Sequence, residues 1–225
     1  MNERITTAVR TRPAESVLAT NRVLRNTYAL LAMTLLFSAA AAGIAMVMNV
    51  PPISPWLVLI GYFGLLFATA KTSDSALGLV FIFALTGFMG FTLGPIINIY
   101  LTVFSNGSQL VMMALGGTGV IFLGLSGYAL TSRRDFSFMG GFLMVGILVA
   151  FFGGLGALFF QIPALMLAVS AMFVLLMAGL ILYQTSQIIH GGETNYILAT
   201  ITLYISIYNL FTSLLHLLGV FAGDD

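Results

Sequence analysis

Long apolar runs separated by short polar breaks dominate the chain. Four stretches contain no Asp, Glu, Lys or Arg, namely residues 26–70, 75–132, 136–192 and 194–223. An uncharged apolar run of roughly 18 residues or more is typical of a membrane-spanning helix. Prolines, glycines and polar turns divide the stretches further. The pattern predicts seven spans, at residues 28–48, 55–70, 76–100, 109–131, 136–160, 164–186 and 195–220.

Composition agrees with this pattern. The 225 residues are 60% hydrophobic and 7% charged, whereas soluble domains are about 25% charged. We therefore expect an all-α integral membrane protein. A net charge of +1 leaves no basic surface for nucleic acid, so no nucleic-acid partner is expected. The chain has no cysteine, which excludes thiol catalysis and cysteine-bound metal, and no cofactor-binding motif is present.

Positive charges gather at one side of the expected topology. Seven spans put all eight Lys and Arg residues on the same side as the N-terminus, which the positive-inside rule makes cytoplasmic. The domain organisation is then a polar tail (1–26), the membrane domain (27–221) and a short end on the opposite side (222–225). Five arginines lie in the tail, namely Arg4, Arg10, Arg12, Arg22 and Arg25.

The turn IIHGGET before the last span gathers unusual residues. Gly191 or Gly192 can end the preceding helix in a left-handed conformation, and Glu193 or Thr194 can cap the next one. The alternative, a metal site on His190 and Glu193, lacks the nearby third ligand that zinc needs. We therefore expect a structural turn and no metal.

The last span carries a stripe of polar residues at helical spacing. They are Asn195, Thr202, Ser206, Asn209, Ser213 and His216. Polar groups that face lipid cost free energy, so we expect this helix to be surrounded by the other six. Two interpretations remain open. The stripe forms hydrogen bonds within a packed core, or it lines a water-filled or ion-conducting cavity, which Gln184 of the preceding span would adjoin.

Glycines recur at helical spacing in three spans. They are Gly87, Gly90 and Gly94; Gly116, Gly119, Gly124 and Gly127; and Gly146, Gly153 and Gly156. Because small residues let helix backbones approach closely, we expect all three sets to lie at helix contacts; the alternative is a hinge, for which Gly94 followed by Pro95 is the candidate.

The segment GLSG, residues 124–127, resembles the nucleophile motif of rhomboid intramembrane proteases, which pair their serine with a histidine of a later helix. Here Ser126 is expected near the cytoplasmic end of its span and His216 near the opposite end of the last. At 1.5 Å per residue across a roughly 30 Å core, about 15–20 Å of depth separates them. We therefore predict that the chain is not an enzyme.

Four longer segments carry a resemblance to a known family. They are VLRNTYALLAMTLLFSA (23–39), TGFMGFTLGPIINIY (86–100), DFSFMGGFLMVGI (135–147) and IIHGGETNYILATITLYISIYNLF (188–211). They resemble the bacterial YccA branch of the Bax inhibitor-1 (TMBIM) family. The resemblance implies seven helices with the last in the centre, a bacterial inner-membrane location with a periplasmic C-terminus, and association with the protease FtsH and its partners HflK and HflC.

Many members of that family carry two aspartates that form a pH-responsive latch on a calcium-permeable path. Aligned on YQTSQ and YISIYNLF, the two positions hold Gln184 and Ser206, neither of which titrates. A pair of carboxylates would share a proton, whereas an amide and a hydroxyl keep one charge state. The sequence therefore departs from the family at the latch itself.

Two functions follow as hypotheses. The first is a non-enzymatic regulator that binds FtsH and is itself a slow substrate through its N-terminal tail. The alternative is a passive cation leak, calcium included, along the polar stripe without the latch. In either case Arg22 and Arg25 are placed to contact anionic lipid head groups, at about 1 kcal/mol each.

Overall fold

The computed structural model describes residues 14–222, and over this range the chain is helical and contains no strand. The elements are α1 (Ala14–Val47), α2 (Pro55–Lys71), α3 (Ala76–Val103), α4 (Gly107–Ser132), the short 3-10 helix η1 (Ser137–Met139), α5 (Gly140–Phe160), α6 (Pro163–His190) and α7 (Tyr196–Ala222). The prediction of an all-α protein is confirmed for the described residues. Long apolar runs become helices because a helix satisfies its own backbone polar groups without water.

Six of the seven long helices have the length and apolar composition to cross a membrane; α2 is shorter. With 17 residues, α2 is about 26 Å long, against a hydrocarbon core of about 30 Å. The helix begins at the prolines that precede it and ends at the polar sequence KTSDS. Six of the seven predicted spans therefore correspond to helices long and apolar enough to cross a membrane, whereas α2 alone is shorter than the hydrocarbon core.

Hydrogen bonds between segments far apart in the sequence mark the two ends of the bundle. At the charged end, Asn195 Nδ2 donates to Asp74 Oδ1 at 2.9 Å, and His190 Nε2 lies 3.1 Å from the carbonyl oxygen of Arg133. At the opposite end, Asn98 Nδ2 donates to the carbonyl oxygen of Met46 at 3.1 Å. Since α2 begins beyond Met46 and ends just before Asp74, it too runs from one end to the other.

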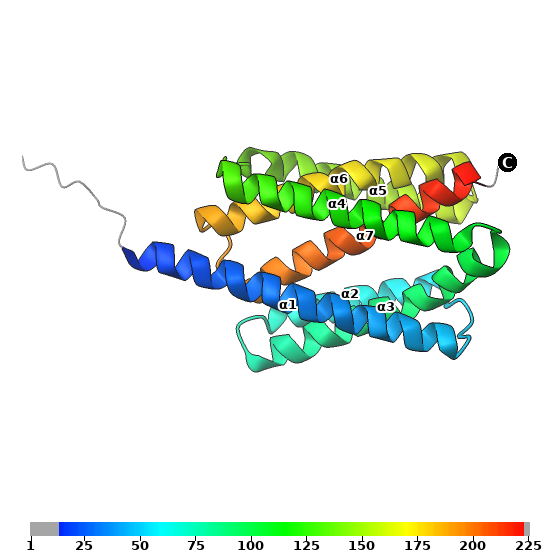
Figure 1. The fold of residues 1–225 in the computed structure, drawn as a ribbon, viewed down its shortest axis with the longest axis horizontal. Coiled ribbons are helices and arrows are strands. Elements are labelled where there is room, and N and C mark those ends of the chain that lie inside the picture. Colours follow the sequence, from blue (N-terminus) through cyan, green and yellow to red (C-terminus); the bar gives the residue numbers. More distant parts are fainter. Residues whose placement is uncertain (1–13, 223–225) are drawn as a thin grey trace, which may run out of the picture.

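The helices form two layers with α7 between them. One layer holds α1, α2 and α3, the other α4, α5 and α6, and α7 crosses diagonally between the layers (Figure 1). No residue from 195 to 219 is exposed, so the prediction that the last helix is enclosed is confirmed. The expected number of neighbours was wrong. α7 packs against α1, α3, α4 and α6, whereas α2 packs on α3 and α5 packs on α6.

Two helices extend beyond the expected spans. α1 begins at Ala14, so helix already occupies the second half of the segment expected to be a polar tail. That half is rich in good helix formers such as Ala, Leu, Arg and Glu, and adding residues to an existing helix avoids the cost of nucleation. α6 continues to His190, which places both Gln187 and His190 on the helix.

The glycines of α3 lie at a close contact with α1. A Cβ at Gly90 would overlap the backbone carbonyl oxygen of Ser38, and one at Gly94 would lie 2.7 Å from that of Ala42. The expected close approach is thus confirmed for α3. It is wrong for α4, where a Cβ added at Gly116, Gly119, Gly124 or Gly127 meets no atom within 4 Å. In α5 it holds for Gly146 and Gly153 but not for Gly156.

Candidate functional site

The turn between α6 and α7 is built by backbone geometry. Gly191 adopts a left-handed conformation with φ of 75°, which glycine reaches without the steric penalty of a Cβ. The N–H of Gly192 donates to the carbonyl oxygen of Gln187 at 2.8 Å, and the N–H of Glu193 donates to the same oxygen at 3.2 Å. These bonds close the C-terminus of α6 as the sequence predicted.

The cap of α7 differs from the prediction. Asn195 Oδ1 accepts hydrogen bonds from the N–H groups of Ile197 (2.9 Å) and Leu198 (3.2 Å), so Asn195 is the capping residue and neither Glu193 nor Thr194 takes that role. Glu193 instead accepts the N–H of Asn195 at 2.8 Å. The expected cap was wrong because α7 begins later than the turn residues indicated. Asn195, which the sequence placed in the polar stripe, terminates it.

His190 fastens the loop between α4 and α5. Its Nδ1 lies 2.9 Å from the carbonyl oxygen of Ser186, and its Nε2 faces that of Arg133. Ser186 Oγ also donates to the carbonyl oxygen of Arg134 at 3.2 Å and accepts the N–H of Phe136 at 3.0 Å. The loop and the end of α6 therefore form one hydrogen-bonded unit.

A carboxylate caps η1 in the same loop. The N–H of Ser137 donates to Asp135 Oδ1 at 2.8 Å, and this bond lowers the pKa of Asp135 below its ordinary value. A lowered pKa keeps the carboxylate ionised throughout the physiological range.

The polar stripe of α7 bonds mainly to its own helix. Thr202, Ser206 and Asn209 each donate to the carbonyl oxygen four residues earlier, at 3.0, 2.7 and 2.9 Å respectively. Such back-bonding satisfies a polar side chain inside a helix without a partner on another helix. These three groups are therefore satisfied without the interhelical bonds that the first interpretation of the stripe expected. Ser213 is buried on the same helix.

Bonds from the middle of α7 to other helices come from residues outside the stripe. The hydroxyl of the fully buried Tyr204 lies 2.6 Å from Ser38 Oγ and donates to the carbonyl oxygen of Thr86 at 3.2 Å. Thr200 Oγ1 lies within 3.3 Å of the carbonyl oxygen of Thr27. Neither Ser38 nor Thr86 was among the predicted site residues. The only sign of their role in the sequence is that each places a hydroxyl group within an otherwise apolar run.

Gln184 and Ser206, the positions aligned with the family's aspartates, are both buried. Contact between Ser170 and His216 fixes the register of the antiparallel pair α6 and α7. Ser206 Oγ donates to the carbonyl oxygen of Thr202 on its own helix, and no hydrogen bond joins it to Gln184 among the described residues. Among the described residues, Gln184 Nε2 has no hydrogen-bond partner.

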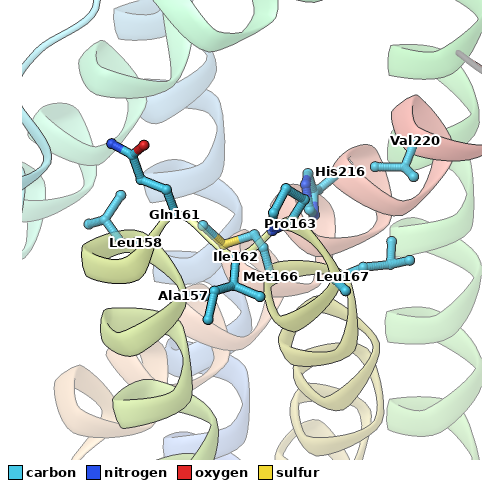
Figure 2. Close-up of a pocket in the computed structure, with 10 residues that line it drawn as sticks. Ala157, Leu158, Gln161, Ile162, Pro163, Met166, Leu167, His216 and Val220 are labelled. Atoms are coloured by element: carbon cyan, nitrogen blue, oxygen red, sulfur yellow. The ribbon is translucent and has the colours of Figure 1, made fainter.

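His216 lies near the opposite end of the bundle. Its Nδ1 is 2.8 Å from Ser170 Oγ of α6, while Ser126, the serine of the GLSG motif, has no hydrogen-bond partner for its buried Oγ among the described residues. His216 therefore pairs with a serine other than Ser126. His216 also lines a cavity of about 490 Å³ between the ends of α5, α6 and α7 (Figure 2).

The five arginines of the predicted tail divide into two groups. Arg22 and Arg25 lie three residues apart on α1 and are exposed, so both side chains can reach a membrane surface at the charged end. Arg4, Arg10 and Arg12 lie outside the described residues.

Comparison with known proteins adds a family and close relatives. The family model described as "Inhibitor of apoptosis-promoting Bax1" matches residues 20–223. A Pseudomonas aeruginosa protein, described as uncharacterized, is 55% identical over 203 residues, which cover 90% of this chain and 91% of that protein. The "Modulator of FtsH protease YccA" of Escherichia coli K12 is 51% identical over 210 residues, covering 93% and 94% of the two chains. A protein of Escherichia coli O6:H1 with the same identity and coverage is described as "Inner membrane protein YccA".

Proposed function

The chain belongs to the Bax inhibitor-1 family, and on this premise we propose that it is a non-enzymatic regulator of the membrane-anchored, ATP-dependent protease FtsH. One observation carries the proposal. Identity of 51% with the modulator of that protease extends over 93% of this chain, so the shared sequence reaches into every helix. The proposed location is the bacterial inner membrane, which the name of a second relative supports.

Charge distribution supports one orientation in that membrane. Lys71, Arg133 and Arg134 all lie in or beside the loops of the charged end, and Arg22 and Arg25 lie on the first helix at the same end. Under the positive-inside rule this end faces the cytoplasm. The C-terminal end of α7 then faces the periplasm.

The short loops and the N-terminal segment suggest how the protein would contact FtsH. Short loops leave no soluble domain between helices, so contact with FtsH, and with HflK and HflC, runs through the helices. The polar segment 1–26 is the part of the chain that a cytoplasmic protease can grip. In the structure α1 starts at Ala14, within this segment, and projects from the charged end (Figure 1). Slow degradation would start from this segment.

Affinity capture from native membranes, combined with a tail deletion, tests the proposal. Deleting residues 2–13 removes the segment before α1 and leaves every described helix intact. We expect FtsH to co-purify with both forms, and the deleted form to have a lifetime several-fold longer, measured by pulse-chase. A variant in which Gly and Ser replace residues 2–13 separates the effect of length from that of sequence. Absence of FtsH from the captured material contradicts the proposal that the protein regulates FtsH. An unchanged lifetime contradicts the proposal that the protease engages the N-terminal segment.

A second candidate function is a passive cation leak, and one observation favours it. Three buried polar atoms near the charged end lack hydrogen-bond partners among the described residues, namely Thr27 Oγ1, Ser126 Oγ and Gln184 Nε2. Buried polar groups in proteins are normally paired with protein or ordered water. Water in this half of the bundle would give a polar entry to the interior.

Flux measurements distinguish the leak from the regulator. Purified protein in liposomes that contain a calcium indicator should conduct calcium above the rate of empty liposomes, and Gln184→Leu should lower the flux several-fold by removing the buried amide. Gln109→Leu is the matched control, because Gln109 is exposed on α4 near the opposite end. Flux equal to that of empty liposomes, or equal loss in both variants, eliminates the leak through this region.

A further inference from the structure

The cavity beside His216 has the features of a lipid site. We propose that it binds one phospholipid of the adjacent leaflet, with an N–H or O–H donor of the lipid head group on Nε2 of His216 and an acyl chain along the apolar wall. The proposal rests on the fold alone and is independent of the proposed link to FtsH. Ethanolamine and glycerol head groups both supply such a donor.

Volume and lining argue for an apolar occupant. At about 490 Å³ the cavity lies within the range of about 300–1,000 Å³ that is common for ligand sites. Water needs two to four polar partners to be ordered in a cavity. The wall is formed largely by apolar side chains such as Leu158, Met166 and Leu167. Gln161, at the rim, points away from His216 (Figure 2).

The hydrogen bonds of Ser170 bear on which nitrogen of His216 carries the proton. Ser170 Oγ has one hydrogen and lies 3.0 Å from the carbonyl oxygen of Met166 and 2.8 Å from Nδ1 of His216. The proposal takes the arrangement in which this hydrogen points to the Met166 carbonyl and Nδ1 donates to Oγ. A neutral imidazole has one N–H, so in this tautomer Nε2 keeps a lone pair that can accept a hydrogen bond.

Depth places this acceptor where a head group can reach it. α7 has 27 residues and is about 40 Å long, which exceeds the hydrocarbon core of about 30 Å. His216 lies six residues before Ala222, the last residue of α7, or about 9 Å from that end. With Ala222 at or beyond the hydrocarbon boundary, His216 lies at most about 9 Å inside it. A head group at the interface can reach this depth while its acyl chain stays in the core.

Exposure at the cavity connects it with surrounding lipid. Ile162 is 43% exposed and Val220 is 39% exposed, and both line the cavity. A chain entering from the bilayer meets apolar side chains first and His216 afterwards. This sequence of contacts fits a phospholipid that lies in the leaflet and turns its head group toward α7.

Retention of defined lipids tests the proposal. Purified protein is placed in nanodiscs that contain equal amounts of phosphatidylethanolamine, phosphatidylglycerol and phosphatidylcholine with identical acyl chains, and the lipids that remain bound are measured by native mass spectrometry. Choline has no N–H or O–H donor. We expect the protein to retain ethanolamine or glycerol lipid roughly fivefold over choline lipid, and the ratio between the first two identifies the head group. Equal retention of all three, or of none, overturns the proposal.

Variants locate the site. His216→Leu should reduce the preference to about one, and His216→Gln, whose amide oxygen can accept, should restore most of it. Ala164→Phe should displace the lipid by filling the cavity, since Ala164 is an exposed residue of its lining. Ala171→Phe, at an exposed position of α6 outside the lining, is the matched control. Unchanged retention in both His216→Leu and Ala164→Phe contradicts the site.

Discussion

Few side chains of α7 form hydrogen bonds to other helices. Tyr204 contacts both α1 and α3 through one hydroxyl group, while most of the stripe bonds within α7. A residue's chemistry was readable from the sequence, but its partner was not. Asn195 shows this most directly, because a position assigned to the stripe caps the helix and bonds to Asp74 instead.

Replacing Tyr204 by Phe tests the importance of this connection. The variant keeps the ring and leaves Ser38 and the carbonyl of Thr86 without their partner. We expect a loss of about 0.5–2 kcal/mol in the free energy of unfolding, measured by SDS titration in mixed micelles. Tyr128→Phe is the control, because Tyr128 is 46% exposed and its hydroxyl has no partner among the described residues. Equal stability of both variants contradicts the role of Tyr204.

At the scale of helices, small residues have different roles in α3 and α4. Gly90 lies against the backbone of α1, whereas Gly116 faces open space. The two sets have similar spacing in the sequence. Periodicity could not separate them because lipid is as apolar as a helix interface, so neither face of an apolar span is marked as internal.

Alanine substitution separates the two roles. Gly90→Ala should lower the free energy of unfolding by roughly 1–3 kcal/mol, because the added methyl group overpacks against α1. Gly116→Ala should leave it unchanged or raise it by about 0.5–1 kcal/mol, since alanine is the better helix former. SDS titration in mixed micelles measures both. A stability loss in Gly116→Ala equal to that in Gly90→Ala would mean that the glycines of α4 are packed after all.

At the scale of the whole molecule, three loops meet at the charged end and fix the relative positions of the helices. Bonds from Asn195 and His190 connect the loop after α6 to those after α2 and α4. The number of long helices was predicted from the sequence. The contacts between these loops were not, because they join residues more than fifty positions apart.

Cysteine labelling tests the orientation, since the chain has no cysteine of its own. Ser75→Cys lies in the loop after α2 at the charged end, and Ser105→Cys lies between α3 and α4 at the opposite end; both positions are exposed. In spheroplasts a membrane-impermeant maleimide should modify Ser105→Cys at once, and Ser75→Cys only after permeabilisation. The reverse pattern would show that the charged end faces the periplasm.

The sequence by itself determined that apolar runs become helices, how many there are and that the last is enclosed, because uncharged segments in lipid must satisfy their own backbone and a polar helix must avoid acyl chains. Tertiary structure alone decided which four helices contact α7, which glycines are packed, and that His216 pairs with Ser170 beside a cavity. These features depend on the rotation and register of each helix. In an apolar solvent, the hydrophobic pattern of the chain specifies neither.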